Sequence, residues 1–256
     1  MVRFTILGSG TSSGIPTISC LCPTCTSDDP KDRRLRTSLL IESDTTTIVI
    51  DSTPDFRQQM LHHNIKKLDA IIYTHSHFDH IGGFDDIRAY NWTMHSPIKI
   101  YLNQTTLDKI QRTFFYAFEE PEQMGGGVPV VDINMIDSEP FVIGDIDIQP
   151  ILLKHGLLDV LGFRIGDFAY CTDTNFIPDS SIAMLSGLDY LIIDALHYKY
   201  HPTHFCVDDA ISIIDKLQPR YKSYLIHIAH QIKHSVCEEK LPDNIRIAFD
   251  GLAIQT

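Results

Sequence analysis

Six consecutive residues, His75 to His80, include four side chains that can bind a metal ion: His75, His77, Asp79 and His80. They follow an apolar, β-branched stretch, Leu68–Thr74, which is typical of a strand. Because side chains alternate between the two faces of an extended segment, His75, His77 and Asp79 can point the same way off the strand's end. Imidazole and carboxylate ligands suit zinc, manganese or iron, so the spacing predicts a metal site.

Polar residues also stand where four other apolar stretches stop. They are Asp51 after Thr47–Ile50, His155 after Ile148–Lys154, Asp173 after Phe168–Thr172, and His227 after Tyr224–Ile226. Any one of them alone is typical of a cap or a satisfied polar side chain. Loops at strand ends carry functional residues on a rigid scaffold, so their repetition favours further metal ligands or residues that orient ligands.

Three cysteines form a second group within six positions: Cys20, Cys22 and Cys25. Three thiolates leave a tetrahedral zinc ion one ligand short. We expect His230, three residues after His227, to complete the site, with His234 and Cys237 as weaker candidates. A closed site has no open position for a substrate, so this zinc would be structural and would join the N-terminal loop to the C-terminal part of the fold.

The 256 residues are 43% hydrophobic, and they predict a single domain, 1–256, with a sizeable core. A formal net charge of -12 disfavours a long nucleic acid as partner. The sequence has no run of 18 apolar residues, so no membrane span is expected. The short apolar start reads as a first strand rather than a signal peptide, and six cysteines without a secretion signal favour a reducing, cytoplasmic location.

Two segments keep two interpretations each. The basic cluster Lys31, Arg33, Arg34 and Arg36 is either a solvated loop or a phosphate contact near the site. Phe118–Pro129, rich in glycine and acidic residues, is either an irregular surface connection or a mobile lid or dimer contact.

Strand patterns alternate with helical ones along the chain. The predicted strands are Phe4–Leu7, Ser38–Ile41, Thr47–Ile50, Ala70–Tyr73, Ile98–Leu102, Ile146–Leu152, Leu161–Ile165, Phe168–Cys171, Tyr190–Ile193, Ser223–Ile226 and Arg246–Phe249. The predicted helices are Asp55–His63, Thr105–Ala117, Ser180–Ser186 and Val207–Leu217. This order fits a layered α/β protein, and strands joined by short turns favour mixed sheets.

The ligand candidates resemble the signature of the metallo-β-lactamase superfamily in the same order along the chain. The resemblance implies an αββα sandwich, two mixed β-sheets flanked by helices. It also implies a dinuclear site: His75, His77 and His155 on one metal, Asp79, His80 and His227 on the other, Asp173 bridging them. Asp51 would orient ligands from outside the site. Two metals, zinc or manganese, would activate a hydroxide for hydrolysis, and Asp79 and Asp51 would count among the catalytic residues.

The cysteine loop, the Ile226–Gln231 run and the glycine-rich start Gly8–Pro16 resemble the PhnP-type phosphoribosyl cyclic phosphodiesterases, relatives of tRNA endonuclease Z. His204, six residues before Ala210, takes the position of their catalytic histidine, with His201 as the alternative. The resemblance implies a phosphodiesterase that hydrolyses a small cyclic ribose phosphate or cyclic nucleotide, and it suggests a homodimer. The alternatives are a tRNA 3′-processing nuclease and a non-catalytic metal-binding or carrier protein.

Overall fold

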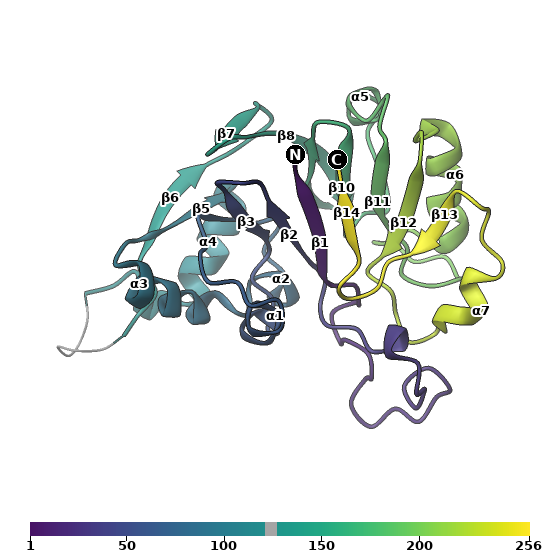
Figure 1. Cartoon of the computed structure of the whole chain (residues 1–256), viewed down its shortest axis with the longest axis horizontal. Coiled ribbons are helices and arrows are strands. Elements are labelled where there is room, and N and C mark those ends of the chain that lie inside the picture. The colour runs from purple at the N-terminus through teal and green to yellow at the C-terminus, as the bar shows by residue number, and fades with distance from the viewer. Residues whose placement is uncertain (121–126) are drawn as a thin grey trace.

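The structure is a computed structural model that describes residues 1–120 and 127–256. Its strands form two seven-stranded sheets that pack face to face (Figure 1). The central six residues of the Phe118–Pro129 segment lie outside the described residues, so its predicted role as a lid or contact stays a prediction. None of the described helices has the length and apolar character needed to cross a membrane.

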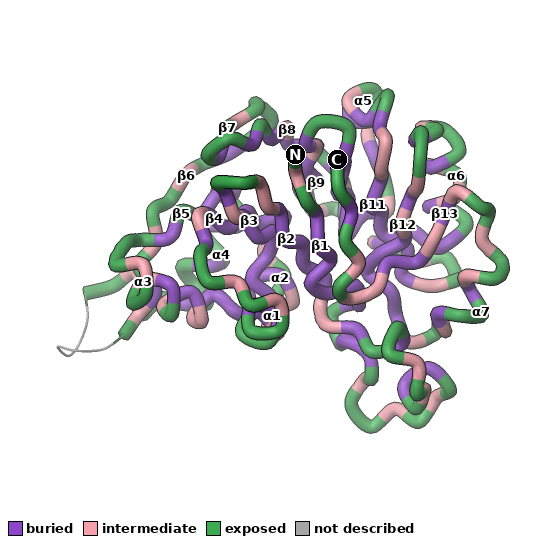
Figure 2. Tube along the Cα trace, viewed as in Figure 1, coloured by how far each residue is buried: buried purple, intermediate pink, exposed green. Residues whose placement is uncertain are grey.

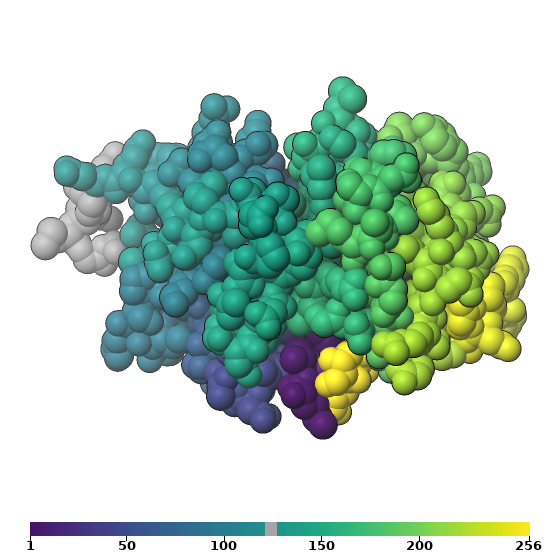
Figure 3. Space-filling view, turned by 90° about the horizontal axis from the view of Figure 1, so that it is seen from above, coloured from purple at the N-terminus to yellow at the C-terminus, as the bar shows by residue number. Residues whose placement is uncertain are grey.

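The first sheet has the strand order β14-β1-β2-β3-β4-β5-β6. Its strands are β1 (Arg3–Gly8), β2 (Ser38–Glu42), β3 (Thr47–Ile50), β4 (Ala70–Ile72), β5 (Ile98–Leu102), β6 (Val131–Met135) and β14 (Ala253–Gln255). β1 is antiparallel to β2, β2 is antiparallel to β3, and β3 to β6 are parallel. The strands β1, β3 and β4 therefore end at the same edge, opposite the two chain termini (Figure 1). Figure 3, seen from above, shows the first and the last residues of the chain beside each other, as the pairing of β1 with β14 requires.

The second sheet has the order β13-β12-β11-β10-β9-β8-β7. Its strands are β7 (Phe141–Ile143), β8 (Ile146–His155), β9 (Leu158–Ile165), β10 (Phe168–Cys171), β11 (Tyr190–Asp194), β12 (Lys222–Ile226) and β13 (Ile245–Ile247). β7 to β10 are antiparallel neighbours, and β10 to β13 are parallel, as the predicted mixed sheets require. A bridge from Gly10 to Ile228 aligns the end of β12 with the end of β1.

Three clusters of buried hydrophobic residues lie between the layers of the fold (Figure 2). Between the sheets, Phe4 stacks on Phe168 with ring centroids 3.7 Å apart. The alternation of β3 sends Ile48 and Ile50 into this central cluster and Val49 to the outer one. Helices cover both outer faces, which confirms the αββα sandwich.

On the outer face of the first sheet, α1, α3 and α4 contribute side chains to the buried cluster. On the outer face of the second sheet, α6 and α7 do so. The helices are α1 (Phe56–His62), α2 (Phe78–Ile81), α3 (Arg88–Met94), α4 (Gln104–Thr113), α5 (Asp179–Met184), α6 (Val207–Leu217) and α7 (His234–Glu238). Short 3-10 turns are η1 (Pro30–Asp32), η2 (Phe84–Ile87) and η3 (Phe115–Ala117). α6 matches its predicted bounds, whereas the predicted helix Thr105–Ala117 divides into α4 and η3.

Candidate metal centre and active site

The first group of ligand candidates is His75, His77 and His155. The loop after β4 supplies the first two and the end of β8 supplies the third. One ring nitrogen from each lies within 4.8 Å of the others. The His155 Nδ1–H donates to the Thr203 carbonyl over 2.6 Å, which leaves Nε2 free to face the group.

The second group is Asp79, His80, Asp173 and His227, again with one atom each within 4.8 Å. The Asp173 carboxylate is central to it: Oδ1 lies 3.3 Å from His80 Nε2 and Oδ2 lies 3.2 Å from His227 Nε2. Oδ2 is also 4.0 Å from His75 Nε2, in the first group. Asp173 therefore lies between the two groups, the position that a bridging ligand needs.

Three residues at strand ends turn into the site through an unusual backbone conformation. Asp51, Asp173 and His227 have φ angles of 64°, 51° and 62°. The left-handed region costs a non-glycine residue roughly 1–2 kcal/mol. The chain carries this strain where a residue after β3, β10 or β12 aims its side chain at the site, which is a common feature of functional sites.

Asp51 is fully buried and hydrogen-bonds to residues of the histidine motif. Its Oδ2 accepts from His80 Nδ1 at 2.7 Å and from the Thr74 hydroxyl at 2.8 Å, and its Oδ1 accepts from the Thr74 backbone N–H. The Thr74 hydroxyl in turn accepts from His75 Nδ1 at 2.9 Å. Both imidazoles are thereby fixed with Nε2 toward the ligand groups.

The donor set fits divalent cations. Among the described residues, the buried Nε2 atoms of His75, His80 and His227 have no hydrogen-bond partner, an arrangement that is costly without a ligand. Burial lowers the pKa of His75 well below its ordinary value, and His80 lowers it further, so this imidazole is neutral. Burial would raise the pKa of Asp79 and Asp173, but nearby histidines outweigh it and keep both ionised.

His80 shows how strongly this site favours positive charge. Burial would lower its pKa, but Asp173, Asp79 and Asp51 outweigh burial and raise that pKa well above the ordinary value. The protonated imidazole is surrounded by the buried carboxylates of Asp51 and Asp173 and the partly buried carboxylate of Asp79. A cation bound there can supply the positive charge instead, and the imidazole then releases its proton.

His204 lies against both groups. Its ring stacks on that of His227 with centroids 4.7 Å apart and lies 4.5 Å from that of His155. Its Nδ1–H donates to Asp194 Oδ2 at 2.8 Å, which leaves Nε2 for a substrate. Burial would lower the pKa of His204, but the Asp194 carboxylate outweighs it and raises the pKa to about 9.

His201, the alternative to His204, lies beside His204 but is not grouped with the ligand candidates. Its ring centroid is 5.2 Å from that of His204, and its Nδ1 accepts from the Thr203 backbone N–H. Burial, reinforced by His204, lowers its pKa below the ordinary value. The geometry thus favours His204 over His201 as the proton donor.

Asp194 was not predicted, although the sequence contains a signal for it. It follows the apolar stretch Tyr190–Ile193 in the same way that Asp51, Asp173 and His227 follow theirs. Its Oδ2 binds His204 and the Thr174 backbone N–H, and its Oδ1 lies 3.7 Å from His227 Nδ1. Its contact with both histidines makes it a positioning residue.

The three cysteines meet His230. The thiols of Cys20 and Cys22 lie 3.2 and 3.4 Å from His230 Nδ1, and all four ligand atoms are within 4.8 Å of one another. This is the donor set of a closed tetrahedral zinc site. The two weaker candidates lie elsewhere: His234 Nδ1 is 3.0 Å from Arg34 Nη2, and Cys237 is buried in the cluster beneath α6.

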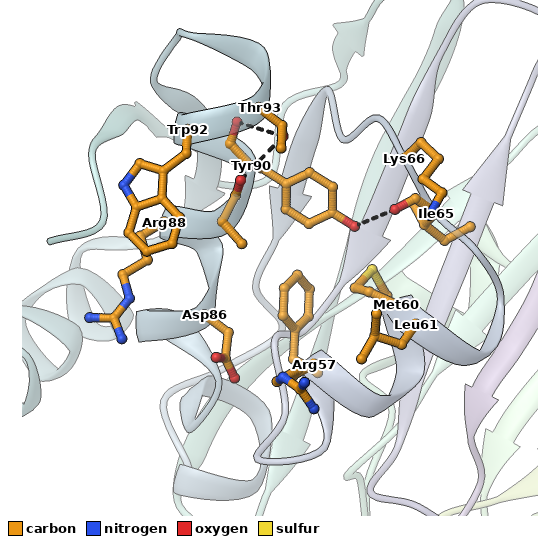
Figure 4. Close-up of a pocket in the computed structure, with 12 residues that line it drawn as sticks. Arg57, Met60, Leu61, Ile65, Lys66, Asp86, Arg88, Tyr90, Trp92 and Thr93 are labelled. Atoms are coloured by element: carbon orange, nitrogen blue, oxygen red, sulfur yellow. Dashed lines mark hydrogen bonds between the residues drawn. The ribbon is translucent and has the colours of Figure 1, made fainter. Parts of the chain in front are cut away.

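Two other features, the basic cluster and an apolar pocket, lie apart from the candidate active site. In the basic cluster, Arg34 is buried against Ser9 and His234, and Arg36 pairs with Asp55 at 2.9 Å, so both have internal partners. An apolar pocket between α1 and α3 is lined by residues such as Met60, Tyr90 and Trp92 (Figure 4). Its walls come from α1, η2, α3 and the residues after α1, not from the loops that carry the ligand candidates.

A model of the beta-lactamase superfamily domain matches residues 46–228, which include the histidine motif and every other active-site ligand candidate. The chain belongs to the metallo-β-lactamase superfamily. A crystal structure of a diphosphatase from the PhnP family is 39% identical and has a TM-score of 0.93, covering 100% of this chain and 98% of that one. The predicted fold and the resemblance to PhnP-type proteins are confirmed.

Two other proteins are similar to this chain, one in sequence and one in fold. An octanoyltransferase of Porphyromonas gingivalis is 39% identical over 255 residues, which are 98% of this chain and 51% of that protein. The chain thus spans about half the length of that curated relative. The short form of human tRNase Z is 18% identical, has a TM-score of 0.72, and covers 99% of this chain and 98% of its own, which shows a shared fold.

We predict that His230→Ala removes one zinc ion per chain and lowers the melting temperature by roughly 5–10 °C. The reason is that a structural zinc contributes directly to folding free energy, and about 2–3 kcal/mol shifts Tm by that amount in a chain of this size. Metal analysis and thermal unfolding measure the two effects. His62→Ala, an exposed histidine in α1, is the matched control. Unchanged zinc content in H230A would contradict the assignment.

Proposed function

We propose that this protein is a metal-dependent phosphodiesterase whose substrate is a small cyclic ribose phosphate or a cyclic nucleotide. The observation that supports it best is the meeting of two ligand groups at Asp173. His204 lies beside them, stacked on His227 and hydrogen-bonded to Asp194. Two adjacent cations with an acid alongside are suited to displacement at phosphorus.

In this proposal, one zinc or manganese ion would be held by His75, His77 and His155, and a second by Asp79, His80 and His227. Asp173, which lies between the two groups, would be a ligand of both. When bound, the two cations supply Lewis acidity to phosphoryl oxygens and lower the pKa of an attacking water. The closed Cys20, Cys22, Cys25 and His230 site would hold a structural zinc that takes no part in the reaction.

The protein's own groups orient and move protons. Asp51 and Thr74 fix the imidazoles of His75 and His80, so the ligand atoms need little rearrangement when the site is filled. His204 donates a proton from Nε2 to the leaving oxygen, while Asp194 holds Nδ1 and keeps the ring charged before transfer. Asp79, ionised beside His80 and His227, accepts a hydrogen bond from the attacking water.

A second candidate is hydrolysis of a diphosphate. The PhnP-family relative of known structure is a diphosphatase and is 39% identical over nearly the whole of both chains. The same ligands and the same acid can act on a phosphoanhydride, because both reactions displace an oxygen from phosphorus.

Two further alternatives are less well supported. A tRNA 3′-processing activity shares the fold, but the net charge of -12 opposes binding of a long polyanion. A non-catalytic metal-binding role does not require His204 to stand charged beside the ligands. We also propose that the protein is cytoplasmic and that it forms a homodimer.

We predict that chelation abolishes hydrolysis and that zinc or manganese restores it. The metal-free protein, the reloaded protein and a mock-treated sample would be assayed with 2′,3′-cyclic AMP and with a diphosphate ester. Hydrolysis that persists in protein shown to be metal-free would refute the proposal. Two bound metals without turnover of either ester would favour the binding role instead.

A further inference from the structure

Large apolar side chains stand in solvent around the candidate active site. Phe78, Leu157, Phe176 and Tyr200 have exposed fractions of 62%, 105%, 57% and 80%. Each lies within four residues of a ligand candidate or of His204: Phe78 follows His77, Leu157 is two residues after His155, Phe176 is three after Asp173, and Tyr200 is four before His204. We call these four residues the apolar rim.

Three of the four rim loops are hydrogen-bonded to one another. His155 donates to the Thr203 carbonyl at 2.6 Å, which joins the Leu157 loop to the Tyr200 loop. The Gly156 N–H donates to Asn175 Oδ1 at 2.6 Å, which joins the Leu157 loop to the Phe176 loop. The Phe205 N–H donates to the Thr174 carbonyl at 2.7 Å and closes the set. The loops therefore converge on one side of the ligand groups.

Leu157 has no structural reason to be apolar. It is the second residue of the two-residue turn between β8 and β9, where His155 pairs with Leu158 and Gly156 takes a φ of 63°. Hairpin tips favour glycine, asparagine and aspartate, which suit the backbone and interact with water. A fully exposed leucine at this tip gains no burial energy in the unliganded protein. As one of several exposed apolar side chains around the site, it is available to contact a ligand.

Phe176 is exposed but not loosely held. Its carbonyl accepts from the Lys154 N–H at 3.0 Å and from the Thr174 hydroxyl at 3.1 Å, and its N–H donates to that hydroxyl. With the backbone fixed, the ring projects from a rigid loop beside Asp173. A preorganised aromatic ring loses little conformational entropy when a flat group stacks on it.

We propose that the apolar rim binds the base of a nucleotide whose phosphoryl group lies at the two ligand groups, so that the substrate class is a nucleoside phosphate rather than a base-free ribose phosphate. This inference rests on the proposed phosphodiesterase function. Among the substituents of a ribose phosphate, the base alone presents a flat apolar face. Phe176 and Tyr200 supply stacking surfaces, and Leu157 covers an edge.

The test compares binding with turnover. Binding of AMP and of ribose 5-phosphate would be measured calorimetrically on the metal-loaded protein, and KM for 2′,3′-cyclic AMP would be measured in parallel. Phe176→Ala and the double variant Phe176→Ala/Leu157→Ala should weaken AMP binding about tenfold, or about 1.4 kcal/mol, because base stacking contributes energies of that order. KM for 2′,3′-cyclic AMP should rise in parallel with the loss of AMP binding, whereas binding of ribose 5-phosphate should change less than about twofold.

The control is Tyr221→Ala, which removes a 59% exposed aromatic ring at the opposite end of β12 from His227. Equal binding of AMP and ribose 5-phosphate to the unaltered protein, or equal weakening of both in F176A, would overturn the proposal. A change of oligomeric state in the rim variants but not in Y221A would assign the rim to a second copy instead. If no ester is hydrolysed while AMP still binds through the rim, the phosphodiesterase function fails and the base site stands.

Discussion

Asp173→Ala should lower kcat/KM by about a thousandfold and reduce the active-site metal content from two ions to one or none. The carboxylate is 2% exposed and lies between the two ligand groups, with one oxygen 3.3 Å from His80 and the other 3.2 Å from His227. Removing it would take one ligand from each proposed cation and a negative charge from a site where two cations would lie close together. Steady-state kinetics and metal analysis on the same preparation measure both effects.

Asp167→Ala is the matched control, because that carboxylate is about half-exposed and pairs with Arg164 and Arg220 at the surface. It should retain two active-site ions and activity within about twofold. If D173A kept two active-site ions and near-normal turnover, the bridging role would be wrong. Loss of the zinc at Cys20, Cys22, Cys25 and His230 in D173A would instead indicate general unfolding, which circular dichroism would show.

The central strands could be predicted because their patterns are local. Thr47–Ile50, Ile98–Leu102 and Phe168–Cys171 are continuous apolar or β-branched runs, and each matches its strand in the structure. β6 (Val131–Met135), β7 and β14 were missed. These are edge strands: of the five residues of β6, three are exposed and none is buried. A strand that buries little side-chain surface leaves a weak hydrophobic pattern, and its position is set by backbone pairing with a neighbour.

Several candidate active-site residues could be located from the sequence for a related reason. Asp51, Asp173 and His227 each interrupt an apolar run, and the structure places each in the left-handed region just past its strand. Asp194 interrupts Tyr190–Ile193 in the same way, but nothing local distinguishes a residue that contacts His204 from one that caps a helix. The choice between His201 and His204 also required tertiary structure, because it depends on which ring meets Asp194 and His227.

The cysteine site also required tertiary structure, because the sequence does not identify its fourth ligand. Three thiols in six residues predict zinc, but the proposed fourth ligand is more than 200 residues away in the sequence. His230, His234 and Cys237 are close together in the sequence, so spacing alone does not choose among them. The structure separates them because α7 turns His234 toward Arg34 and buries Cys237 in the core. Long-range pairing of this kind is fixed by the bridge between Gly10 and Ile228, which has no signature in either segment.

His204→Gln should lower kcat by roughly 10²–10⁴-fold while leaving the metal content unchanged. A positioned general acid contributes about that factor to a proton-transfer step. His204 hydrogen-bonds Asp194 and stacks on His227, but we assign it to neither ligand group, so its loss should spare the metals. Kinetics and metal analysis test this, with His201→Gln as the control. The centroid of that ring lies 5.2 Å from that of His204, and its loss should lower kcat less than about tenfold.

Asp194→Asn should change the pH dependence of kcat if His204 is the general acid. The Asp194 carboxylate raises the pKa of His204 to about 9 against the opposing effect of burial, so the acid form persists through neutral pH and is lost as pH rises through that pKa. An amide at residue 194 keeps a hydrogen-bond acceptor but removes the charge, so the pKa of His204 should fall and the alkaline limb of the kcat profile should move to lower pH. A merely structural Asp194 would reduce stability or the amount of active enzyme without moving that limb. An unmoved alkaline limb in D194N, together with an unchanged kcat in H204Q, would show that the leaving oxygen takes its proton from another group.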